Sequence, residues 1–201
     1  ADKLGEQGAA PERVSMLAND GSDANWWDRA GEFIKGQYGR LDWAIINACP
    51  PPLADGDLVD WKRDASAQLE SAFQTLRTVM PLMRFNSQGG AIVVIAPASS
   101  IKPEPGLLQL IRAAAREAAE DNIRVNAIAT ESADAAALQS FQNIVRETGS
   151  ERAAFEIIAN LSPPLARYAA GDDVMRLLLM LLTDDAPVTG ATLVVEGGYT
   201  L

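Results

Sequence analysis

The hydrophobic residues of the chain fall into short runs separated by longer amphipathic stretches. Five of the runs are predicted to be strands because they are short, apolar and bounded by turn residues. Uninterrupted apolar runs are typical of strands that are buried on both faces of a parallel sheet. The five predicted strands are Val14–Ala18, Trp43–Ile46, Ala91–Ala96, Ile123–Ala129 and Ala191–Val195.

Between these runs, apolar residues recur at the spacing of an α-helix. The helices expected are Ala24–Tyr38, about Trp61–Phe85, Leu107–Glu120, one or two within Ser132–Asn160, and one from Asp172 or Asp173 to Leu182. Strands that alternate with helices imply a parallel sheet with right-handed crossovers. We therefore expect an α/β fold with a doubly wound parallel sheet, formed as one domain over residues 1–201.

Composition and charge disfavour some classes of binding partner. The formal net charge of −10 disfavours binding to nucleic acid or to an anionic membrane surface. No apolar run approaches the ~20 residues that a membrane-spanning helix needs. Cys49 is the one cysteine, which fits a reducing compartment, and no secretory signal is visible. We expect a soluble, cytoplasmic protein.

The residue types that are absent remove several chemistries. The chain has no histidine, so it has neither a Ser–His nor a Cys–His nucleophile. One cysteine without histidine makes a zinc site improbable, and no metal ligand set is expected. Neither GxGxxG nor GxxxxGK[ST] occurs, so no standard phosphate-binding loop is present.

Five segments occur in the order in which one known family carries its motifs. They cover almost the whole chain, and in this order the chain resembles the short-chain dehydrogenase/reductase superfamily. The resemblance implies a Rossmann-like sheet and NAD(P)-dependent oxidoreduction. The segments are Leu41–Ala48, Leu76–Met83, Gly89–Ile95, Ile123–Ile128, and Val188–Gly190 with Val195–Gly198.

The resemblance also shows where this sequence departs from the family's enzymes. Those enzymes use a tyrosine as general acid/base, a lysine four residues later, a serine, and an asparagine on the long helix. No tyrosine of this chain is followed four residues later by lysine. The serine position corresponds to Pro97 and the asparagine position to Gln68, while Ser99 and Ser100 are weak candidates that also suit a turn.

Further departures lie nearby. The glycine of the family's NNAG motif is Cys49 here, and the first asparagine is Ile46. Only 23 residues separate Ser100 from Arg124. The helix that should carry the catalytic pair is therefore expected to be about ten residues short, which is nearly three turns.

By comparison with the family, this sequence also lacks elements that bind the cofactor. The opening residues Ala1–Leu4 resemble the end of the family's second helix, so we expect the first strand–helix–strand unit to be missing. Asp20 and Asn47 match positions that line the adenine and the ribose, although acidic turn residues are also common for structural reasons. We expect no cofactor in this chain, and NAD or NADP in a partner subunit or in a more complete sequence.

Three hypotheses for function follow. The first is a non-catalytic subunit that supports an active dehydrogenase, similar to the inactive subunit of a heteromeric hydroxybenzylsuccinyl-CoA dehydrogenase. The second is an active NAD(P)-dependent oxidoreductase whose sequence here is incomplete, and the third is a regulatory ligand-binding module. The partner is expected to contact the helices 61–85 and 107–120, unless their apolar stripes face this chain's own sheet. Those stripes are Leu69, Phe73, Leu76 and Met80, and Ala114, Ala115 and Ala118.

Overall fold

A computed structural model describes most of the strands and helices that the sequence predicts. It describes residues 15–18, 25–48, 58–97, 105–130, 144–150, 164–165, 169–183 and 187–198. The elements in chain order are α2 (Trp26–Tyr38), β1 (Trp43–Asn47), α3 (Leu58–Met83), β2 (Gly90–Pro97), α4 (Pro105–Ala118), the 3-10 turn η3 (Ala119–Asp121), β3 (Ile123–Thr130), α7 (Gly171–Thr183) and β4 (Thr192–Val195).

The described strands form one parallel sheet in the order β1-β2-β3-β4. Trp43 pairs with Ala91 at the start of β1, and Thr130 at the end of β3 pairs with Val195. The sheet confirms the predicted α/β fold and four of the five predicted strands. Observed and predicted strand ends agree within one residue.

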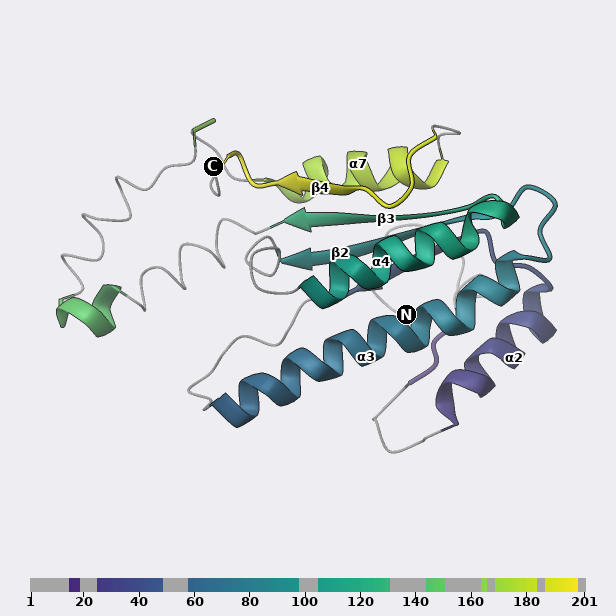
Figure 1. Cartoon of the computed structure of the whole chain (residues 1–201), viewed down its shortest axis with the longest axis horizontal. Coiled ribbons are helices and arrows are strands. Elements are labelled where there is room, and N and C mark those ends of the chain that lie inside the picture. Colours follow the sequence, from purple (N-terminus) through teal and green to yellow (C-terminus); the bar gives the residue numbers. More distant parts are fainter. Residues whose placement is uncertain are drawn as a thin grey trace.

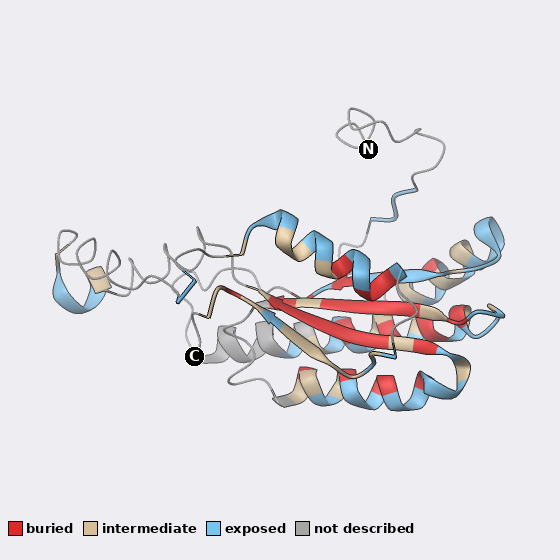
Figure 2. Ribbon diagram, turned by 90° about the horizontal axis from the view of Figure 1, so that it is seen from above, coloured by how far each residue is buried: buried red, intermediate tan, exposed pale blue. Residues whose placement is uncertain are grey.

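Helices cover both faces of this sheet, as expected for a doubly wound fold. α3 and α4 lie on the near face and α7 lies on the far face (Figure 1). Side chains alternate along β2, so Ile92 and Val94 join the core under α3 and α4, while Ala91 and Val93 join the core under α7. The central strands β2 and β3 are consequently buried on both sides (Figure 2).

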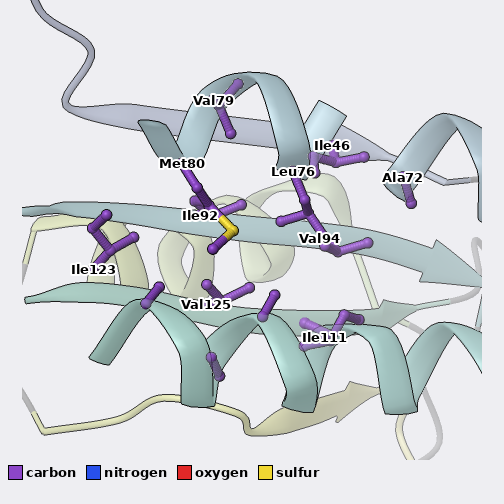
Figure 3. Packing of buried hydrophobic residues seen from close by; sticks show 14 of the residues in the cluster. Ile46, Ala72, Leu76, Val79, Met80, Ile92, Val94, Ile111, Ile123 and Val125 are labelled. Carbon is purple, nitrogen blue, oxygen red and sulfur yellow. The ribbon is translucent and has the colours of Figure 1, made fainter. Parts of the chain in front are cut away.

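The larger core lies between the sheet and the helices α3 and α4. Leu76 and Met80 of α3 and Ile111 of α4 meet Val94 and Val125 of the sheet (Figure 3). Helical periodicity identified these apolar stripes correctly. It left open which neighbour they would contact.

The stripes predicted for a partner mostly face this chain's own core. Leu76 and Met80 are buried there, and so are the three alanines of α4. Small side chains on α4 let its backbone approach the sheet closely. Phe73 is 48% exposed and remains available to a partner. Contact with a partner through α3 and α4 stays a prediction, and it must use the outward faces of these helices.

The predicted strand Val14–Ala18 is wrong for the residues that are described. Residues 15–18 carry no strand. Instead, the hydroxyls of Ser15 and Tyr38 are hydrogen-bonded at 2.7 Å, and the indole N–H of Trp26 donates to the carbonyl of Ala18 at 2.7 Å. A strand requires a neighbouring strand to complete its ladder, and an apolar run by itself does not supply one.

Residues 144–148 are helical, and Gly149 follows them with a φ of 67°. This agrees with a helix break near Gly149, whereas the rest of the predicted helical stretch Ser132–Asn160 lies outside the described residues. Among the helices that the structure describes, none is both long and apolar enough to cross a membrane.

Both ends of α7 are held by side chains. At its start, the carboxylate of Asp173 accepts a hydrogen bond of 3.0 Å from the N–H of Ala170, so Asp173 rather than Asp172 makes the capping contact. At its end, the guanidinium of Arg124 donates to the carbonyls of Leu181 and Leu182 at 2.7 and 3.4 Å. These carbonyls would otherwise lack a helical partner.

The side chain of Asn126, on β3, is hydrogen-bonded to the segment that precedes β4. Its side chain is 1% exposed, donates to the carbonyl of Val188 at 2.8 Å and accepts from the N–H of Ala191 at 3.1 Å. Next to it, the N–H of Val125 donates to the hydroxyl of Thr189 at 3.0 Å. The matches to the family at 123–128 and 188–190 are therefore two sides of one hydrogen-bonded contact.

The first prediction concerns this contact. Asn126→Ala removes the side-chain partner of two partly buried backbone groups, the carbonyl of Val188 and the N–H of Ala191, at about 1–2 kcal/mol for each group. We expect the free energy of unfolding to fall by about 2–4 kcal/mol in urea titration. Gln109→Ala on the exposed side of α4 is the control and should change it by less than about 0.5 kcal/mol. Equal losses in both variants would contradict the assignment.

The second prediction concerns the turn that leads into β2. Gly89 has a φ of 75°, and a Cβ there would fall against the backbone carbonyl of Asn122. Gly89→Ala should lower the free energy of unfolding by about 2–4 kcal/mol, because strain and collision add. Gly39 has a similar φ of 73° but open space around it, so Gly39→Ala should cost about 1–2 kcal/mol. If thermal or urea unfolding gives the same loss for both, the collision with Asn122 contributes nothing.

Candidate functional site

The carboxyl ends of the strands form the edge at which a sheet of this type binds ligands. β1 ends at Asn47, β2 at Pro97, β3 at Thr130 and β4 at Val195. Asn47 is level with Ile95, and Thr130 is level with Pro97 and Val195. The arrowheads point to one side of the molecule, where α3 also begins (Figure 1).

The structure brings part of the predicted site to this edge. Asn47 is the last residue of β1 and is exposed. Pro97 is the last residue of β2, and Gln68 lies in the first half of α3, whose start is at the same edge. The side chains of Pro97 and Gln68 are outside what the structure describes. The predicted positions Asp20, Cys49, Ser99 and Ser100 lie outside the described residues altogether.

Two positions next to the edge are occupied by core side chains. Ile46 is buried in the cluster under α3, and Ala96 is buried beside Pro97. Neither side chain carries a group that could bind a substrate oxygen or transfer a proton. The position of the family's first asparagine therefore contributes to packing in this chain.

The helix α4 presents no acid or base to the sheet. Its buried side chains are all apolar, whereas Arg112 and Arg116 are exposed on the opposite side. General acid/base catalysis needs a titratable group within hydrogen-bond reach of the reacting oxygen. The inward face of α4 offers none. Its buried residues are Leu107, Ile111, Ala114, Ala115 and Ala118.

Two polar residues at the edge were not singled out as site residues from the sequence. Thr130 ends β3, and Glu196 follows β4 with only 4% of its surface exposed. Their strands are neighbours, because Thr130 pairs with Val195. Each is the first residue after an apolar run that predicts a strand, and this position was the signal available in the sequence.

A side chain with a shifted pKa lies at the amino end of β1, opposite the carboxyl edge. The pKa of Arg40 is raised by its hydrogen bonds to the carboxylate of Asp42 and by the charge of that group. Both residues are exposed and precede β1. This pair therefore lies away from the carboxyl edge.

The glycines at the start of β2 leave no room for a pyrophosphate. The family's pyrophosphate site requires glycines whose missing side chains leave room for the phosphates. A Cβ added at Gly89, Gly90 or Gly106 would instead meet atoms of this chain, namely those of Asn122, Met83 and Leu69. The contact at Gly106, at the start of α4, is an ordinary van der Waals contact with Leu69 at 3.4 Å. Nor do three His, Cys, Asp or Glu residues gather to hold a metal ion in the part of the chain that is described.

Comparison with known proteins identifies the family. The family model described as enoyl-(acyl carrier protein) reductase matches residues 1–200. Cyclopentanol dehydrogenase of Comamonas sp. is 30% identical over an alignment of 218 positions, which covers 99% of this chain and 84% of that protein. SDR family member 4 of Caenorhabditis elegans is 30% identical over 183 residues, covering 83% of this chain and 68% of that protein. The chain belongs to the short-chain dehydrogenase/reductase family.

Solved structures agree with this assignment. Hydroxysteroid dehydrogenase from Escherichia coli superposes with a TM-score of 0.72 at 25% identity, over 98% of this chain and 78% of that one. The enoyl-(acyl carrier protein) reductase from Anaplasma phagocytophilum, solved with NAD, has a TM-score of 0.67 at 22% identity and covers 99% of this chain and 78% of that one. The second likeness concerns the fold alone.

The alignment with cyclopentanol dehydrogenase also indicates internal gaps. It extends over 218 positions, whereas this chain has 201 residues, so at least 17 positions (218 minus 201) have no residue here. These gaps lie inside the matched span. The shortened segment between β2 and β3 stays a prediction.

The third prediction is that restoring the Tyr-x-x-x-Lys spacing on α4 is not sufficient for turnover. The double variant Leu108→Tyr with Arg112→Lys creates a Tyr-x-x-x-Lys spacing on α4. Its NAD(P)-dependent oxidation of cyclopentanol, followed by absorbance at 340 nm, should stay at background, because position 112 faces away from the sheet and because catalysis requires the cofactor to be held beside the acid/base group. The Comamonas dehydrogenase serves as the positive control for the assay. Turnover about tenfold above background would show that the chain already holds a cofactor.

Proposed function

We propose that this chain is a non-catalytic subunit of the short-chain dehydrogenase/reductase family that binds and supports an active relative. One observation carries the proposal. The inward face of α4 is wholly apolar, and no Tyr-x-x-x-Lys occurs anywhere in the 201 residues. The family's acid/base pair therefore has no equivalent in this sequence.

Substitutions inside well-formed elements support the same proposal. β2 reaches the carboxyl edge with Ala96 and Pro97 where the resemblance implies a serine, and β1 places the core residue Ile46 where it implies an asparagine. An incomplete sequence would remove residues, but it would not exchange those in strands that are present. These exchanges favour loss of activity in the protein itself.

The partner surface that we propose is the outward side of α3 and α4. Phe73 is half exposed on α3, and the residues about one helical turn before and after it, Glu70 and Arg77, are exposed. A half-exposed aromatic residue can become the buried anchor of an interface. The active subunit would supply NAD or NADP together with the catalytic residues. We place the assembly in the cytoplasm, since the single cysteine fits a reducing compartment.

A second candidate is an active NAD(P)-dependent oxidoreductase whose full sequence is longer than the one given. It is favoured by the relatives, which are named as dehydrogenases and reductases and align with nearly the whole chain. The glycine-rich turn and the Tyr–Lys segment would then belong to residues absent from this sequence. The intact mass of the native protein separates the two candidates, because 21.4 kDa is the value for the chain as given.

The fourth prediction concerns the cofactor. Isothermal titration of the purified chain with millimolar NAD+, NADH, NADP+ or NADPH should give no saturable heat, because the sequence contains no glycine-rich phosphate-binding turn. The enoyl-(acyl carrier protein) reductase from Anaplasma phagocytophilum, solved with NAD, is the control in the same buffer. A micromolar dissociation constant for any of the four would favour the active enzyme instead.

The fifth prediction concerns the partner. The tagged chain, purified from its native organism, should carry an active dehydrogenase of the same family, identified by mass spectrometry and NAD(P)-dependent turnover. Phe73→Glu should lower the recovery of that dehydrogenase at least tenfold, since a charge would enter the proposed interface. Leu179→Glu is the matched control. Leu179 is also 48% exposed, but it lies on α7, across the sheet from α3.

Two results would count against the proposal. Equal recovery from Phe73→Glu and the unaltered chain would move the interface away from the exposed side of α3. An isolated monomer in the native organism, with no dehydrogenase attached, would remove the subunit role and leave a regulatory ligand-binding module.

A further inference from the structure

We draw no further inference here: the strongest candidate, the half-exposed apolar face that Trp43 and Ile45 form on β1 beside α7, carries nothing because nothing in the structure shows what covers it.

Discussion

The side-chain amide of Asn126 determines how the last strand joins the sheet. It lies within β3 and is hydrogen-bonded to both ends of the segment 188–191, so both of its polar functions are satisfied inside the protein. The segment cannot slide along β3 without leaving buried polar groups unpaired, which costs more than an ordinary exposed hydrogen bond contributes. The position of β4 follows from this contact. So does the pairing that sets Thr130 beside Val195 at the carboxyl edge.

The same strand also determines where α7 lies. Arg124, two residues before Asn126, donates to the final carbonyls of α7, and Asp173 holds the other end. The apolar side of α7 is thereby kept over Ala91 and Val93, whose burial on that face completes the double-sided burial of β2. Burial of apolar surface stabilises this layer without directionality. The hydrogen bonds of Arg124 and Asp173 select one placement of the helix among those that burial would allow.

Periodicity predicted the elements well where burial on both faces produces an uninterrupted apolar run, as in Ala91–Ala96 and Ile123–Ala129. It failed for Val14–Ala18, because an apolar run carries no information about whether a neighbouring strand is available. For the site, the family resemblance selected Asn47 and Pro97, and both lie at the carboxyl ends of their strands. The hydrogen bond between Asn126 and Val188 joins residues 62 positions apart, and no local sequence pattern predicts it.

The family motifs of this chain contain two kinds of position: those that stabilise the fold and those to which the resemblance assigns a catalytic role. The motif residues that match, among them Arg124, Asn126 and Thr189, make hydrogen bonds that hold the fold together. The positions that depart from the pattern, such as Pro97 and Gln68, are those to which the resemblance assigns chemistry. A chain that is required to fold but not to react would lose residues in this selective manner, since a scaffold residue costs stability when it is replaced and a catalytic residue often does not. Removal of a block of sequence has no reason to distinguish between the two kinds of residue. The selectivity therefore supports the proposed role as a non-catalytic subunit.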